Sequence, residues 1–157
     1  VGARLARLLG RPLVDTDRDV EERAGRSPDA MIRDGDESEF RAIEADVMRA
    51  AFSRPGAVVA TGGGAALHAD LLRSAANLWP VVLLDADDDV LLARWAATPR
   101  AALTGLPLRQ ELARQRAERM AVYRDVARVT MDVSETSPDE TAESIADLVD
   151  RDWRAGG

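Results

Sequence analysis

Residues 57–64 read AVVATGGG, a short apolar run that ends in a hydroxyl group and three glycines. Small and β-branched residues without polar alternation predict a strand covered on both faces, as in a parallel sheet between helices. In such sheets ligands bind beyond the carboxyl ends of the strands, where glycines let backbone N–H groups approach an anion or a sugar-like ring. The same glycines also suit a plain turn into a helix, so the stretch alone leaves both interpretations open.

The composition limits the classes of protein to which the chain can belong. Its 157 residues, 46% of them hydrophobic, can bury one core, so we expect a single domain over residues 1–157. The net charge of −7 argues against binding to the phosphate backbone of nucleic acids. The sequence has no run of about 20 apolar residues that could span a membrane. It has no cysteine, which fits a reducing compartment. We therefore expect a soluble, cytoplasmic protein that binds neither membranes nor nucleic acids.

The basic residues are all of one kind. All 21 are arginine, so these residues contain neither a Schiff-base lysine nor the lysine of a P-loop. An acidic protein can still bind anions where a few arginines converge in a desolvated cleft. Guanidinium groups fix carboxylates best, because they bind them through two parallel hydrogen bonds.

Short apolar runs alternate with amphipathic segments along the whole chain. The runs predict strands at residues 12–14, 57–60, 80–85 and 129–133. The segments between them predict helices at residues 1–9, from 17 to about 25, 27–34, 36–52, about 67–77, 87–97, 108–126 and from 137 onward. This alternation predicts a three-layer α/β/α sandwich with a mainly parallel sheet.

Two groups of polar residues are candidates for a site. Asp15-Thr16-Asp17 follows a strand and could hold a metal-bound water and a substrate hydroxyl, or Thr16 or Asp17 could simply cap the next helix. Arg41 and Glu44 share a helix face, where a surface pair is worth only about 0.2 to 0.5 kcal/mol. A functional role for Arg41 would need a carboxylate ligand. His68, the only histidine, is expected to be solvated.

Four ordered motifs together resemble shikimate kinases, small enzymes related to the nucleoside-monophosphate kinases. They are Asp15-Thr16-Asp17, Gly35 with the segment 39–44 (EFRAIE), the turn 61–64 (TGGG), and Arg119 four residues before Tyr123. Each motif is weak alone, but their order and spacing extend the resemblance over nearly the whole chain. It implies a P-loop NTPase-like fold and ATP-dependent phosphorylation of the 3-hydroxyl of shikimate, a step in aromatic amino acid biosynthesis.

The resemblance also implies how shikimate is bound. Asp17 would bind a shikimate hydroxyl and accept its proton. Arg41 and Arg119 would clamp the carboxylate, with Glu44 orienting Arg41. The residues expected to line the ring are Gly63 and Gly64.

A second set of implied roles concerns ATP and Mg²⁺. Asp15 would hold a magnesium-bound water, and Arg94 would lie near adenine. Arg100 would meet the transferring phosphoryl group from a mobile lid over about residues 98–108. The family's lid carries Arg-Pro-Leu-Leu where this chain has Arg-Ala-Ala-Leu at residues 100–103.

One feature of the family is not found in the 157 residues. Shikimate kinases begin with a strand and a G-x-x-x-x-G-K-[ST] loop that cradles phosphates. We expect this chain to be a truncated form whose first strand is missing, and to be monomeric. The rival interpretations are a lysine-free derivative that binds shikimate without phosphorylating it, a helix-rich interaction domain without a ligand, and a related sugar-acid kinase.

Overall fold

Residues 1–97 and 106–153 are described by a computed structural model in which helices and parallel strands alternate. The strands are β1 (Leu13–Asp15), β2 (Val58–Ala60), β3 (Val82–Asp85) and β4 (Val129–Asp132). The helices are α1 (Gly2–Leu8), α2 (Thr16–Ala24), α3 (Pro28–Arg33), α4 (Glu37–Phe52), η1 (Ala65–His68), α5 (Ala69–Ala76), α6 (Asp88–Ala96), α7 (Leu108–Val126), α8 (Pro138–Leu148) and η2 (Val149–Trp153). Each predicted element is present, and α5 is preceded by the 3₁₀ turn η1.

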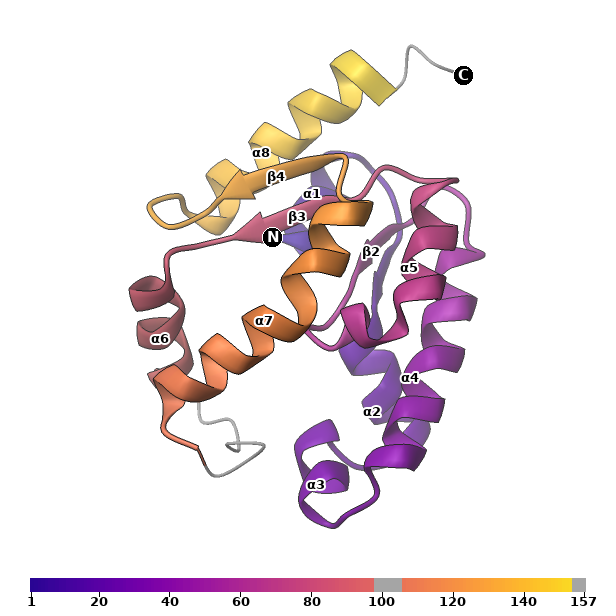
Figure 1. Ribbon diagram of the computed structural model, residues 1–157. Coiled ribbons are helices and arrows are strands. Elements are labelled where there is room, and N and C mark those ends of the chain that lie inside the picture. Colours follow the sequence, from indigo (N-terminus) through magenta and orange to yellow (C-terminus); the bar gives the residue numbers. More distant parts are fainter. Residues whose placement is uncertain (98–105, 154–157) are drawn as a thin grey trace.

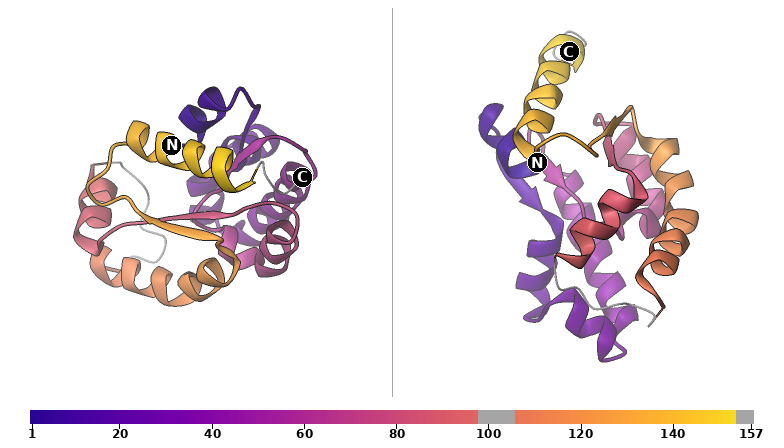
Figure 2. Two further views of the ribbon diagram at one scale, coloured as in Figure 1. Left: turned by 90° about the horizontal axis from the view of Figure 1, so that it is seen from above. Right: turned by 90° about the vertical axis from the view of Figure 1, so that its left-hand side faces the viewer.

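The strands pair in parallel and lie between two layers of helices, which confirms the predicted α/β class. β1 pairs with β2, and β3 pairs with β4. Helices α1 and α8 lie on one side of the strands, and α5 and α7 lie on the other (Figures 1 and 2). Within residues 1–97 and 106–153 the two strand pairs are not hydrogen-bonded to each other.

A cavity of about 480 Å³ lies between the two strand pairs. It is lined by residues 58–60 of β2 and residues 82–84 of β3, and by residues of α1, α4, α5, α7 and α8. The facing edges of β2 and β3 therefore border the cavity, and this separation accounts for two strand pairs in place of one continuous sheet.

Local signals fix most helix ends where the sequence predicted them. Ser27 caps α3 with a proline at the next position, and Ser137 and Glu140 form the predicted capping box of α8. Gly25 ends α2 at φ 69°, a left-handed conformation that suits glycine. The cap of α2 is Asp15, whose side chain accepts a hydrogen bond from the Arg18 backbone N–H, so the alternative of capping by Thr16 or Asp17 does not hold.

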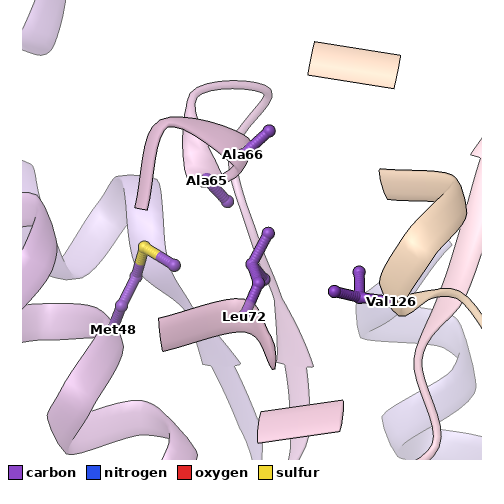
Figure 3. Packing of buried hydrophobic residues seen from close by; sticks show 5 residues of the cluster. All are labelled: Met48, Ala65, Ala66, Leu72 and Val126. Atoms are coloured by element: carbon purple, nitrogen blue, oxygen red, sulfur yellow. The ribbon is translucent and has the colours of Figure 1, made fainter. Parts of the chain in front are cut away.

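Two apolar clusters hold the helices in place. The first cluster joins α4, η1, α5 and α7 and consists of Met48, Ala65, Ala66, Leu72 and Val126 (Figure 3). A second cluster of Val20, Met31, Phe40 and Val47 joins α2, α3 and α4. Because Ala65 and Ala66 are buried directly after the triple glycine, the first cluster anchors the turn at 62–64.

The buried face of α1 differs from the predicted one. Leu8 was expected inward but is 54% exposed, whereas Ala6 is buried. Gly2 lies so close to β2 that a Cβ there would be 3.0 Å from the Ala60 Cβ. Small residues four positions apart let α1 approach the strand closely, and this contact outweighs the leucine pattern.

The remaining helices agree with their predicted faces to different extents. Phe40, Val47 and Ala51 of α4 are buried as expected. None of the residues of α6 is buried, although Leu91, Leu92 and Trp95 were expected to point inward.

Among residues 1–97 and 106–153, no helix has both the length and the apolar character of a membrane span.

Candidate functional site

The turns that follow β1 and β2 meet at one edge of their strand pair. Thr16 is buried, and its Oγ1 accepts a hydrogen bond of 3.2 Å from the Gly62 backbone N–H. The strands are parallel neighbours, so their carboxyl ends lie side by side, as expected for a ligand site in such sheets. Asp17 is exposed beside this junction, and a Cβ at Gly62 would overlap its carboxylate.

Arg41 and Glu44 form a partly buried pair that includes a third residue. Glu44 is 5% exposed, and its Oε2 accepts hydrogen bonds from Arg41 Nη1 at 2.8 Å and from His68 Nε2 at 2.9 Å. Arg41 also lies over the Phe40 ring, with its Cζ 4.7 Å from the ring centroid. The pair is therefore fixed by burial and stacking, unlike an ordinary surface pair.

His68 corrects an expectation. Its side chain is 14% exposed and bonded to Glu44, so the prediction of a solvated residue was wrong. The prediction placed residue 68 on the first turn of an α-helix. It ends the 3₁₀ turn η1 instead, which has about three residues per turn.

Arg119 reaches the same glycine turn from α7. Its Nη1 donates to the Gly63 carbonyl oxygen at 2.9 Å and to Gln115 Oε1 at 3.0 Å. Burial lowers the pKa of Arg119 below its ordinary value; nearby Tyr123 raises it, and Arg41 lowers it further. Its Nε is buried without a hydrogen-bond partner.

Tyr123 holds the glycine turn against α7. Its hydroxyl donates to the Gly63 carbonyl oxygen at 3.0 Å and accepts from the Ala66 backbone N–H at 3.3 Å. Burial is the main cause that raises the pKa of Tyr123, and the charges of Glu44 and Asp17 act in the same direction. The sequence motif contained Tyr123, but it did not reveal this role.

The glycines leave room for both arginines. A Cβ at Gly64 would lie 2.9 Å from Arg41 Nη1 and from Glu44 Oε1, and a Cβ at Gly63 would lie 3.7 Å from Arg119 Nη1. Two guanidinium groups from different helices thus border one turn. In the described part of the chain, no carboxylate forms an ion pair with Arg119. This arrangement is suited to an anion that accepts from both arginines.

Of the residues expected to contact the nucleotide, Arg94 lies away from the glycine turn and Arg100 is outside the described residues. Arg94 donates from Nη2 to the Val133 carbonyl oxygen at 2.7 Å, beside the end of β4. Arg100 and most of the expected lid lie outside the described residues. Asp15 uses one carboxylate oxygen, Oδ1, to cap α2.

The metal site has a limited set of candidate ligands. Among residues 1–97 and 106–153 there is no group of three or more side chains that could hold a metal ion. Mg²⁺ is commonly bound by one or two carboxylates together with water and substrate phosphates. A single aspartate such as Asp15 fits that pattern, whereas it would not fit a site built from protein ligands alone.

Comparison with known proteins places these residues in a family. The model of the shikimate kinase family matches residues 1–150. A shikimate kinase of Thermobifida fusca is 40% identical over 151 residues, which cover 93% of this chain and 84% of the relative. A shikimate kinase of Mycobacterium tuberculosis is 35% identical over 139 residues, covering 88% of this chain and 78% of the relative.

Solved structures agree with the sequence comparison. The shikimate kinase of Acinetobacter baumannii in complex with shikimate superposes with a TM-score of 0.84 at 28% identity, covering 94% of this chain and 83% of that one. The shikimate kinase of Aquifex aeolicus gives a TM-score of 0.79 at 26% identity, covering 99% and 90% of the two chains. The fold is therefore P-loop NTPase-like.

Proposed function

This chain belongs to the shikimate kinase family, and we propose that its glycine turn and two arginines form the shikimate pocket of an enzyme that phosphorylates the shikimate 3-hydroxyl with ATP. The main observation that supports this proposal is that Arg41 on α4 and Arg119 on α7 both border the turn at 62–64. The product would enter aromatic amino acid biosynthesis, and we place the enzyme in the cytoplasm as a monomer.

The charges of the pocket support a carboxylate substrate. Arg119 is desolvated and keeps an unpaired Nε, while Arg41 pairs with Glu44, which it shares with His68, and with Glu37 at 3.3 Å. A bound carboxylate would neutralise Arg119, which has no carboxylate partner among the described residues, and would accept from its Nε–H. Gly63 and Gly64 would let the ring of the substrate lie against the turn, because neither has a side chain there.

Asp17 is proposed to bind the reacting hydroxyl and take its proton. It is exposed beside Gly62, at the end of the strand pair where substrates of such folds bind. ATP with Mg²⁺ would supply the phosphoryl group and neutralise its developing charge. We propose that Asp15 holds a magnesium-bound water, that Arg100 acts from the lid over residues 98–108, and that Arg94 lies near adenine.

Calorimetric titration with shikimate tests the proposal directly. We expect saturable binding at one site, and no binding of the methyl ester of shikimate, which lacks the charged carboxylate. Binding of shikimate without turnover in a protein supplied with a phosphate loop would favour the non-phosphorylating derivative. Preferential binding of an open-chain sugar acid would favour a sugar-acid kinase. If shikimate, its methyl ester and the sugar acid all fail to bind, an interaction domain without a ligand would be favoured.

The two aspartates should be separable by substitution. In a protein supplied with a phosphate loop, Asp17→Asn should lower shikimate affinity and turnover but leave nucleotide binding intact, because it removes the base at the hydroxyl. Asp15→Asn should mainly raise the Mg²⁺ concentration needed for half-maximal rate. Titrations of shikimate and Mg²⁺ against rate measure both effects. Identical profiles for the two variants would reject this division of roles.

Gly62→Ala should act through Asp17. The added Cβ overlaps the Asp17 carboxylate and would force that exposed side chain to move. We expect shikimate affinity to fall by roughly tenfold or more, with a change in unfolding free energy below about 1 kcal/mol because the displaced side chain is exposed. Calorimetry and thermal unfolding measure the two quantities. In an Asp17→Ala background the same change should have almost no further effect on affinity, and an equal loss there would contradict the explanation.

A further inference from the structure

Three side chains form a hydrogen-bonded line along one face of α7. Glu111, Gln115 and Arg119 are spaced four residues apart and therefore lie one above another on the helix. Gln115 Nε2 donates to Glu111 Oε1 at 2.7 Å, and Arg119 Nη1 donates to Gln115 Oε1 at 3.0 Å. The line runs from a fully buried carboxylate to an arginine of the proposed shikimate pocket.

The orientation of the Gln115 amide is fixed by its neighbours at both ends. An ionised carboxylate only accepts hydrogen bonds, so Glu111 requires the NH₂ group of Gln115. Arginine only donates, so Arg119 requires the amide oxygen. The opposite orientation would set oxygen against oxygen and N–H against N–H. Glu111 is itself held by Arg114 Nη2 at 2.9 Å, which keeps the start of the line in place.

These bonds determine which edge of Arg119 lacks a hydrogen-bond acceptor among the described residues. Both acceptors, Gln115 Oε1 and the Gly63 carbonyl oxygen, bind the same nitrogen, Nη1. The Nε is buried without a partner, and no acceptor in the described part of the chain is bonded to Nη2. Nε and Nη2 form one edge of the guanidinium group, and such an edge binds a carboxylate through two parallel hydrogen bonds.

We propose that Gln115 is a positioning residue that engages Nη1 of Arg119 and thereby directs its Nε–Nη2 edge to the substrate carboxylate. This inference rests on the proposed function for its ligand, but the effect on Arg119 itself does not depend on shikimate. Gln115 touches no reacting atom. Its influence passes entirely through the guanidinium group of Arg119.

Gln115→Leu tests this role, because leucine has a similar size and cannot accept a hydrogen bond. Gln110→Leu is the matched control, since Gln110 is an exposed glutamine on the same helix. The first readout is the ¹⁵N relaxation order parameter of the Arg119 Nε–H in the free protein. We expect it to be high in the wild type and in Gln110→Leu, and to fall in Gln115→Leu toward the value of the exposed Arg7. An Arg119 that is equally ordered in all three proteins would overturn the proposal.

The second readout is shikimate affinity. Gln115→Leu should raise the dissociation constant about 10- to 150-fold, as expected for a lost hydrogen bond to a charged group. In an Arg119→Ala background the same substitution should change it less than about twofold, because the two residues act as one unit. Equal losses in both backgrounds would show that Gln115 acts independently of Arg119 and would reject the proposal. If the wild type binds no shikimate, the proposed function fails, and the order parameter alone decides the role of Gln115.

Discussion

Replacement of Arg41 or Arg119 by alanine is expected to weaken shikimate binding by about 2 to 5 kcal/mol, because a desolvated anion loses a charged partner. This loss corresponds to roughly 30- to 4,000-fold in the dissociation constant. Lysine at either position should rescue binding only in part, since it supplies the charge but not the planar pair of donors. Calorimetry measures each affinity.

The two variants should not be equally damaging. Glu44 is 5% exposed, and without Arg41 the one described residue still bonded to its carboxylate would be His68. That carboxylate would then lie near the proposed carboxylate of the substrate, and two like charges in a desolvated site repel each other. We therefore expect a larger loss of affinity for Arg41→Ala than for Arg119→Ala.

Matched controls are available on the same helices. Arg49 on α4 and Arg124 on α7 are both exposed, and Arg49 pairs only with nearby Asp46 in the described part of the chain. Alanine at either position should leave shikimate affinity within about twofold, as surface pairs contribute little. An unchanged affinity in Arg41→Ala would show that the assigned substrate is wrong.

The sequence was informative where local chemistry determines structure. The AVVATGGG stretch predicted β2 and the turn that follows it, and the shared helix face of Arg41 and Glu44 predicted their pairing. These features depend on neighbours within a few residues. Parallel pairing then brings the ends of β1 and β2 together, so the positions of Thr16 and Gly62 follow from the fold class.

Other parts of the site depend on contacts between distant segments and could not be predicted. His68 ends the 3₁₀ turn η1 and meets Glu44 on α4, and no apolar periodicity in the sequence marks that contact. The role of Gln115 depends on the complete burial of Glu111 and on the carbonyl oxygen that Gly63 presents to Arg119. A glutamine on an arginine-rich helix carries no such signal in the sequence.

The cavity between β2 and β3 leads to the prediction with the largest expected effect. Its walls are the edges of two parallel strand pairs, and its remaining lining includes the apolar side chains of Val1, Leu5 and Ile145. Such edges carry backbone N–H and C=O groups that a further strand would pair, and the apolar walls would cover its side chains. A β-strand therefore suits this cavity better than a small polar ligand does.

We expect that about 15 residues fused before Val1, a β-branched strand followed by Gly-x-x-Gly-x-Gly-Lys-Ser, will fill this cavity and create an active kinase. The loop would hold phosphates through backbone N–H groups at a helix N-terminus, which arginine side chains elsewhere cannot replace. One preorganised donor can change a rate by roughly 10²- to 10³-fold, and here several would be gained together. A coupled assay should detect ATP consumption that requires both Mg²⁺ and shikimate.

Two control proteins separate the contribution of the strand from that of the loop. A fusion with the strand but a glycine-serine linker in place of the loop should raise the thermal midpoint without activity, because only the sheet is completed. A fusion in which the grafted lysine is replaced by methionine should fold equally well and lose most of the rate. Equal ATP consumption by the 157-residue protein and by the full fusion would refute the need for the loop. A well-folded fusion that binds shikimate and ATP but remains inactive would refute the kinase assignment, since every group required for positioning and charge neutralisation would then be in place.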